Sequence, residues 1–218
     1  MCRYKYAFYD MDGTIGNTQE GIFKCTEYAF EKLGVKIDNS YESLRRVVGP
    51  PLVHAYMEYF GLSEADAEKA RDLYRERYSV TGIYEMKLYD GMEKSLKSLK
   101  DAGVKLAVVS AKPQEFIDRI VPHFGLDKYF DLTVGVTMHE KDTSKAHLIR
   151  RALEHFGITD MSEVVMVGDR MYDLDGAAEL GIDGIGVSYG FGDIEELKNS
   201  PHVFIADSPG AVAKFIKS

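Results

Sequence analysis

Short, continuous runs of hydrophobic residues recur along the chain, and several of them stop abruptly at an acidic residue, a serine or a glycine. Such runs predict strands that are buried on both faces, because a strand with one wet face alternates between hydrophobic and polar residues. The predicted strands cover residues 6–9, 104–109, 132–136, 164–167, 185–187 and 203–205. Their continuity favours a parallel sheet that is covered by helices on both faces.

Helical spacing fills the stretches between the later strands, where hydrophobic residues recur three or four positions apart. Helices are predicted over residues 92–102, 116–124 and 145–156, and a glycine follows each of them. Strand and helix thus alternate from about residue 86 onward. This order predicts an α/β fold with a Rossmann-like, doubly wound parallel sheet as its core.

The segment 17–85 has a different pattern. Its hydrophobic residues repeat at helical spacing over 23–33, 52–60 and 63–80, and it contains no convincing strand pattern. We therefore predict an α-helical cap domain at 17–85, inserted into a sheet domain that is formed by residues 1–16 and 86–218. The two crossings between these domains contain glycine and can act as hinges.

The amino-acid composition excludes several classes of protein and of partner. The 218 residues are 45 % hydrophobic and 28 % charged, which is typical of a folded globular protein. The formal net charge of −8 disfavours nucleic acid and anionic membranes as partners. No hydrophobic stretch is long enough to cross a bilayer. Two cysteines exclude a disulfide scaffold and a multi-cysteine zinc site, and we expect a cytoplasmic protein.

Polar side chains follow three of the predicted strands. Asp10 and Asp12 come directly after the first strand, Ser110 follows the second and Asp169 follows the fourth. The carboxyl ends of parallel strands meet at one edge of the sheet, where ligands bind. One of two neighbouring carboxylates can act as a nucleophile and the other as a general acid and base, although Asp and Gly are also ordinary turn formers. The convergence of three strand ends favours the catalytic interpretation.

These residues resemble the four motifs of the haloacid dehalogenase superfamily of phosphotransferases, in the right order and on the expected elements. The motifs correspond to the segment 10–14, Ser110, Lys145 at a helix start, and Gly168-Asp169 with Asp173. Within the superfamily the chain is most similar to the phosphoglycolate phosphatase-like branch, and parts of it resemble bacterial phosphatases or 5′-nucleotidases. The resemblance covers essentially the whole chain, including a helical cap inserted after the first motif.

The resemblance implies a role for each motif residue. Asp10 is expected to be the nucleophile and to form an aspartyl phosphate. Asp12 is expected to protonate the leaving alcohol and then to take a proton from the hydrolytic water. The substrate phosphate is expected to contact Ser110, Lys145 and Thr14. The implied activity is that of a phosphoric monoester hydrolase.

The acidic residues of these motifs need positive charge beside them, from basic residues or from a metal ion. Together Asp10, Asp12, Asp169 and Asp173 crowd negative charge around a phosphate, and that charge repels the substrate unless cations compensate it. The resemblance implies that Mg²⁺ is held by Asp10, the backbone carbonyl of Asp12 and Asp169, with Lys145 as a second cation. It gives Asp173 an outer position, from which it orients a bound water or Lys145. Ligands that are all oxygen atoms fit Mg²⁺ better than zinc.

We therefore expect a Mg²⁺-dependent phosphatase that acts on a small-molecule phosphomonoester, with a cap that excludes water and selects the substrate. Phosphoglycolate, a sugar phosphate and a 5′-nucleotide all remain compatible. One alternative is a phosphomutase of the β-phosphoglucomutase type, against which Thr14 counts. The other is a non-enzymatic switch phosphorylated on Asp10, against which the length of the chain and the acid at position 12 count.

Several other polar residues have weaker interpretations. We expect Lys112 to be solvated and Arg170 to form an ion pair as readily as a catalytic contact. Arg46 is expected at a solvated helix end, with contact to a distal group of the substrate as the second interpretation. Asn17 and Glu20 are expected to cap a helix.

Overall fold

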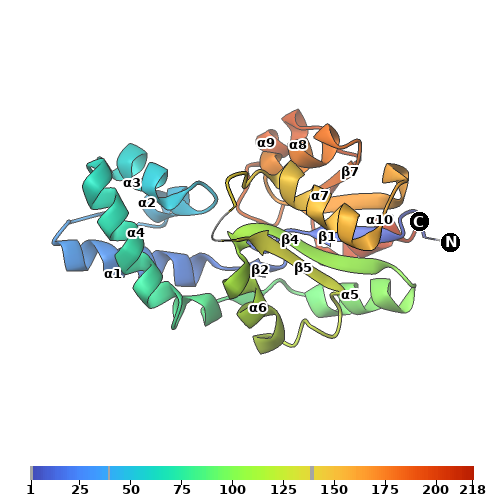
Figure 1. The fold of residues 1–218 in the computed structure, drawn as a ribbon, viewed down its shortest axis with the longest axis horizontal. Coiled ribbons are helices and arrows are strands. Elements are labelled where there is room, and N and C mark those ends of the chain that lie inside the picture. The colour runs from blue at the N-terminus through green and yellow to red at the C-terminus, as the bar shows by residue number, and fades with distance from the viewer. Residues whose placement is uncertain (1, 39, 138–139) are drawn as a thin grey trace. The chain divides into compact units, whose positions relative to one another are not determined.

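The computed structural model describes residues 2–38, 40–137 and 140–218. The chain divides into two compact units (Figure 1). The first combines Met1–Gly16 with Leu88–Ser218 and holds the sheet, and the second is Asn17–Lys87 and is built of helices. The chain therefore returns to the sheet unit at positions 87–88, slightly beyond the residue 85 at which the sequence pattern suggests the change.

A six-stranded parallel sheet forms the centre of the first unit, with the strand order β5-β4-β1-β6-β7-β8. Its strands are β1 (Tyr6–Tyr9), β4 (Lys105–Pro113), β5 (Leu132–Val136), β6 (Val164–Gly168), β7 (Asp183–Val187) and β8 (Phe204–Ala206). From β1 the chain adds β4 and β5 on one side and β6, β7 and β8 on the other. Ligands bind at such a switch point, beyond the carboxyl ends of the strands.

Helices cover both faces of this sheet: α7 and α8 lie on one face, and α5 and α6 lie on the other (Figure 1). The helices of this unit are α5 (Met92–Asp101), α6 (Gln114–His123), α7 (Lys145–Phe156), η3 (Met161–Glu163), α8 (Met171–Glu179), α9 (Ile194–Asn199) and α10 (Pro209–Ile216). On the α7 face, Phe8, Val109 and Val134 of the sheet pack against Leu148 and Ile149 in one buried cluster. This doubly wound α/β arrangement confirms the predicted fold class.

The second unit contains the helices α1 (Gln19–Leu33), α2 (Tyr41–Leu44), η1 (Arg45–Val47), α3 (Leu52–Phe60), α4 (Glu64–Tyr78) and η2 (Gly82–Tyr84). Aromatic rings fill part of its core: Phe30 of α1 lies 5.1 Å from both Tyr56 and Phe60 of α3, measured between ring centroids. Two short strands, β2 (Gly16–Asn17) and β3 (Lys87–Leu88), pair where the chain passes between the units. Helices dominate this segment, as the spacing of its hydrophobic residues predicts.

Some elements differ from the sequence-based expectations. Helices α8, α9 and α10 were not predicted, because they are short and their hydrophobic residues repeat over few turns. The residue that caps α1 is Thr18, and the side chain of Asn17 instead accepts a hydrogen bond from the backbone N–H of Gln19 at 3.1 Å. Within the described ranges, no helix combines the length and the hydrophobicity that crossing a bilayer requires.

Candidate active site

The loop that follows β1 turns back tightly on itself. The carbonyl oxygen of Met11 accepts hydrogen bonds from the backbone N–H groups of Thr14 and Gly16, at 3.4 and 3.2 Å. Gly13, directly before Thr14, has a φ of 79°, a left-handed conformation that favours glycine. A Cβ atom at Gly13 would lie 2.1 Å from Oδ2 of Asp169, so this loop can approach the end of β6 only with glycine at this position.

Lys145 forms ion pairs with the residue that follows β1 and with a residue in the first turn of α8. It is the first residue of α7, whose first turn is capped by the side chain of Ser144. Its Nζ atom lies 2.7 Å from Oδ1 of Asp10 and 2.7 Å from Oδ1 of Asp173. Nζ also donates to the carbonyl oxygen of Val109 at 3.1 Å, and the side chain is only 7 % exposed. The three N–H bonds of this ammonium group therefore each have an acceptor.

Three buried aspartates form an acidic cluster: Asp10, Asp169 and Asp173 each bring one carboxylate oxygen within 4.8 Å of the others. Burial, together with the charges of Asp173 and Asp10, raises the pKa of Asp169 to about 8. Burial also raises the pKa of Asp10 to about 6, against the opposing charge of Lys145. Burial disfavours the charge on Lys145, but its two neighbouring carboxylates hold the pKa of that amine above its ordinary value. The cluster thus carries more negative charge than Lys145 neutralises.

Two hydrogen bonds hold the carboxylate of Asp169. The hydroxyl of Thr14 donates to Oδ1 at 3.3 Å, and the backbone N–H of Phe191 donates to Oδ2 at 2.8 Å. The turn at Gly13 brings Thr14 against the end of β6. Contact of Thr14 with the substrate phosphate stays a prediction.

Glycines allow the loop after β7 to lie directly on Asp169. A Cβ atom at Gly190 would lie 2.3 Å from Cβ of Asp169 and 2.4 Å from the carbonyl oxygen of Gly13. A Cβ atom at Gly192 would lie 1.8 Å from the carbonyl oxygen of Asp169. Asp169 is therefore packed against backbone at distances that any larger residue at Gly190 or Gly192 would prevent.

Asp12 has a partner of its own. Its Oδ2 atom lies 3.0 Å from Nζ of Lys112, whose side chain is only 5 % exposed. The expectation that Lys112 is solvated is therefore wrong. Ser110 is buried, and its hydroxyl oxygen accepts a hydrogen bond from the backbone N–H of Lys112 at 3.3 Å. Among the described residues, the side chain of Asp12 lies outside the acidic cluster.

The acidic cluster fits a hard divalent cation. The cluster contains three carboxylates, and one ammonium group pairs with two of them, which leaves two uncompensated negative charges in a buried place when all are ionised. The donors are carboxylate oxygens, the ligands that Mg²⁺ and Ca²⁺ prefer, and the group contains neither the thiolates nor the imidazoles that favour zinc. The third carboxylate of this cluster belongs to Asp173, which the sequence-based expectation places outside the ligand set.

Two arginines singled out in the sequence have local partners. Arg170 donates from Nε to Oε1 of Glu196 at 2.8 Å, the ion pair considered for it. Its backbone N–H also donates to Oδ2 of Asp173 at 3.1 Å, which ties Asp173 to the start of α8. In the helical unit, the guanidinium of Arg46 lies 5.8 Å from the ring centroid of Tyr59.

Sequence reasoning missed Lys112, Phe191 and the glycines on either side of Phe191. A signal for Lys112 was present, because residues two apart on a strand share a face and Lys112 follows Ser110 at that spacing. The segment Gly190-Phe191-Gly192 likewise follows a predicted strand at the edge where ligands bind. Neither signal shows by itself which atom each residue contacts.

Comparisons with known proteins agree with this geometry. A 5′-nucleotidase of Pseudomonas aeruginosa is 37 % identical over 206 residues, which cover 94 % of this chain and 92 % of that protein. The tyrosine-protein kinase PtkA of Mycobacterium tuberculosis is 35 % identical over 185 residues, and the match spans 84 % of this chain but 62 % of PtkA. The crystal structure of a predicted phosphatase from Clostridium acetobutylicum superimposes with a TM-score of 0.87 at 40 % identity, over 97 % of both chains.

A family model for haloacid dehalogenase-like hydrolases matches residues 7–187. The match runs from β1 to the end of β7 and so includes the loop of Asp10 and Asp12, the start of α7 and the aspartates that follow β6. Its extent, and the arrangement of the buried aspartates around Lys145, show that this chain belongs to the haloacid dehalogenase-like hydrolase family.

Proposed function

We propose that this chain is a phosphatase that hydrolyses small phosphomonoesters through a covalent intermediate on Asp10. One observation carries the proposal: Lys145 bridges Asp10 and Asp173 inside a buried acidic cluster at the carboxyl edge of the sheet. A buried carboxylate beside a fixed cation is a suitable nucleophile for an anionic phosphate group. Family membership and the phosphatase and 5′-nucleotidase relatives support the same reaction class.

In the first step, an Oδ atom of Asp10 forms a bond to phosphorus while the bond from phosphorus to the ester oxygen breaks. Asp12 donates its proton to the departing alcohol oxygen. In the second step, a water oxygen attacks phosphorus, the bond to Asp10 breaks, and Asp12 takes the proton of the water. Two displacements divide one of the slowest reactions in biology into two smaller barriers.

Other residues hold the phosphate during both steps. The ammonium group of Lys145 neutralises phosphate oxygens beside Asp10, and the hydroxyl of Ser110 at the end of β4 donates to them. We infer that Asp10 and Asp169, with the backbone carbonyl of Asp12, hold Mg²⁺, and that Asp173 orients Lys145. When bound, this ion supplies positive charge that offsets the carboxylates and polarises a phosphate oxygen.

We infer that the helical unit Asn17–Lys87 is the cap that selects the substrate. A cap that closes over the site leaves room for a small metabolite rather than a folded phosphoprotein, and phosphoglycolate, a sugar phosphate or a 5′-nucleotide fits this description. The net charge of −8 argues against nucleic acid as a partner. Both cysteines are free thiols, which fits the reducing cytoplasm as the proposed location.

The test is a panel of these phosphomonoesters assayed for phosphate release with Mg²⁺, using the wild-type enzyme and Asp10→Asn. The amide that replaces the carboxylate in this variant is a poor nucleophile, so we expect turnover to fall by at least about a thousandfold. Asp175→Asn is the matched control, because Asp175 is an exposed residue of α8 and its change is expected to leave turnover unaltered.

Two outcomes would overturn the proposal. Retention of most activity by Asp10→Asn would remove Asp10 as the nucleophile. Phosphoryl transfer to a sugar phosphate, or from ATP to a tyrosine peptide, without release of phosphate from any ester would replace water as the acceptor and assign a mutase or a kinase instead.

A further inference from the structure

The carboxyl end of β4 contains a bulge. Val109 pairs with Val134 and Pro113 with Val136, so the three residues 110–112 stand opposite the single residue Gly135 of β5. Extra residues of this kind bend a strand and redirect its side chains, and bulges are common beside active sites. The residues inside this bulge are Ser110, Ala111 and Lys112, and it turns Lys112 inward while Ala111 is exposed.

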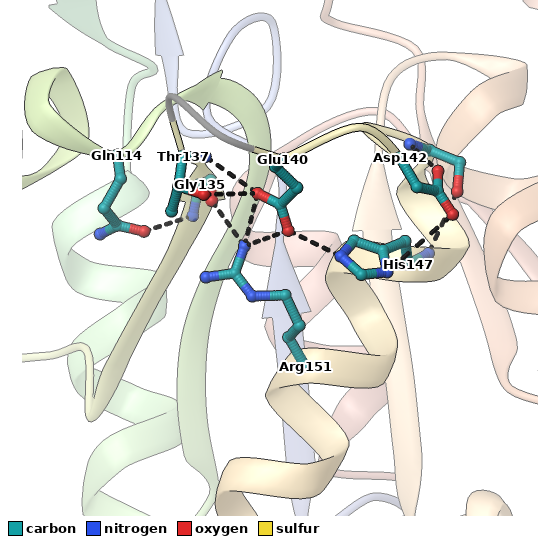
Figure 2. A network of polar contacts seen from close by, with 8 residues as sticks. Gln114, Gly135, Thr137, Glu140, Asp142, His147 and Arg151 are labelled. Atoms are coloured by element: carbon teal, nitrogen blue, oxygen red, sulfur yellow. Dashed lines mark hydrogen bonds and ion pairs between the residues drawn. The ribbon is translucent and has the colours of Figure 1, made fainter.

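A polar network fixes the strand that faces the bulge (Figure 2). The side chain of Gln114 accepts a hydrogen bond from the backbone N–H of Gly135 at 2.6 Å, and the carbonyl of Gly135 accepts one from Nη1 of Arg151 at 2.8 Å. Arg151 in turn pairs with Glu140 at 2.9 Å. A Cβ atom at Gly135 would lie 2.7 Å from the carbonyl oxygen of Lys112. The backbone of Lys112 is therefore packed closely against an anchored residue.

This backbone arrangement delivers the amine of Lys112 to Asp12. Nζ lies 3.0 Å from Oδ2 of Asp12, and the lysine side chain is 5 % exposed. The other carboxylate oxygen of Asp12, Oδ1, is buried and has no hydrogen-bond partner in the part of the chain that the structure describes. A buried carboxylate oxygen without a hydrogen-bond partner costs free energy. Such a cost is tolerated where the atom takes part in binding or catalysis.

We propose that Lys112 is a positioning residue: it holds Oδ2 of Asp12 and thereby aims Oδ1 at the oxygen of the leaving alcohol. The proposal rests on the phosphatase reaction proposed above, in which Asp12 handles the proton. Proton transfer requires the donor atom within hydrogen-bond reach of the departing oxygen, so loss of the lysine contact misplaces the acid without removing it.

Substrates with different leaving groups distinguish this positioning role of Lys112 from a role as a phosphate ligand. Departure of p-nitrophenolate needs no proton, whereas departure of the alkoxide of phosphoglycolate does. The kinetic constant kcat/KM covers only the steps up to departure of the leaving group when that departure is irreversible. The ratio of kcat/KM for the alkyl ester to that for the aryl ester therefore reports how well Asp12 acts as an acid.

We expect Lys112→Met to lower kcat/KM for phosphoglycolate by at least about tenfold and kcat/KM for p-nitrophenyl phosphate by less than about threefold. Lys112→Arg, which keeps a cation, is expected to restore part of the ratio. Lys105→Met is the matched control, because Lys105 lies on the same strand with its side chain 57 % exposed and pairs with Asp131. It is expected to leave both constants unchanged.

A double-variant cycle tests that Lys112 acts through Asp12. In an Asp12→Asn background there is no acid to position, so Lys112→Met is expected to cause no further loss with phosphoglycolate. An equal loss with both esters, in variants that unfold at the wild-type temperature, would overturn the proposal and make Lys112 a phosphate ligand. If Lys112→Met does not fold, the ratio of the two kcat/KM values is measured in Lys112→Arg and Lys112→Gln instead. A ratio equal to that of the wild-type enzyme in both variants contradicts the proposal.

Failure of the proposed function gives a different result. A wild-type enzyme that releases phosphate from neither ester refutes the phosphatase assignment and this role together. If the wild-type enzyme is active but the Lys112 variants leave the ratio of the two kcat/KM values unchanged, only the role of Lys112 is refuted.

Discussion

Asp169 illustrates how backbone, rather than side chains alone, builds the site. Its carboxylate accepts from Thr14 and from the backbone of Phe191, and Gly13 and Gly190 lie against it. The two glycines come from loops that are far apart in the sequence. Each must lack a side chain, because the space that a Cβ atom needs is occupied by Asp169 or by backbone.

Gly190→Ala tests this close packing. The new Cβ would meet the carbonyl oxygen of Gly13 at 2.4 Å, and a backbone atom cannot move aside as the end of a flexible side chain can. We expect the free energy of unfolding to fall by about 1–3 kcal/mol and turnover to fall by at least about tenfold. Urea unfolding and phosphate release measure the two effects.

Gly210→Ala is the control for that substitution. Gly210 lies in the first turn of α10, and a Cβ atom there meets no atom within 4 Å. It is expected to keep wild-type stability and turnover. If Gly190→Ala behaves like Gly210→Ala, the close approach of the β7 loop to Asp169 is not a requirement of the site.

At the scale of elements, the strand before Asp10 and the helix that begins at Lys145 could be predicted because their signals are local, whereas helix α8, which bears Asp173, was not predicted. The hydrophobic run that forms β1 ends at Asp10, and Ser144 caps α7 directly before Lys145. The contact of Lys112 with Asp12 could not be predicted in this way, because it depends on the bulge in β4 and on its fit against Gly135. The contact between Phe191 and Asp169 likewise joins two loops that follow different strands.

The helical unit has an ion pair whose contribution depends on pH. Arg77 at the end of α4 donates two hydrogen bonds to Glu85, at 2.6 and 3.0 Å, and the two side chains are 22 % and 18 % exposed. These hydrogen bonds lower the pKa of Glu85 below its ordinary value, against the effect of burial. The stabilisation is therefore fully present above the pKa of glutamate in the unfolded chain and is lost as the pH falls through the lower pKa of the folded state.

We expect Glu85→Gln to lower the free energy of unfolding by about 1 kcal/mol at neutral pH, with the difference from wild type shrinking as the pH falls below about 4. Glu42→Gln is the control in the same unit, because Glu42 is 72 % exposed in its pair with Arg45 and is expected to have little effect. Urea unfolding across this pH range measures both. A Glu85→Gln difference that is constant with pH would show that the Arg77 pair is not its cause.

At the scale of the whole molecule, the buried aspartates that serve the reaction lower the stability of the fold. Asp10, Asp169 and Asp173 repel one another in the metal-free protein, and a bound divalent cation removes that repulsion. An ion that binds only the folded chain also stabilises it, by about 2.7 kcal/mol at a hundred times its Kd.

We therefore expect Mg²⁺ to raise the unfolding temperature of the wild-type protein and EDTA to reverse the change. Asp169→Asn removes a carboxyl group whose ionisation is opposed by burial and by the charges of Asp173 and Asp10, so we expect it to unfold at a higher temperature than the wild-type protein when both are free of metal, and to gain little from Mg²⁺. Thermal unfolding with and without the ion measures both effects. An equal gain from Mg²⁺ in Asp169→Asn would place the ion elsewhere.

Detection of a phosphoryl group on Asp10 tests the proposed mechanism most directly. Asp12→Asn is expected to slow hydrolysis of the intermediate, so the enzyme mixed with p-nitrophenyl phosphate and Mg²⁺ and quenched in acid should retain it. Mass spectrometry of the peptide that spans β1 and its loop is predicted to show one phosphoryl group, located on Asp10. Release of phosphate at a measurable rate with Asp10 unmodified, or with the phosphoryl group on another residue, would contradict the mechanism.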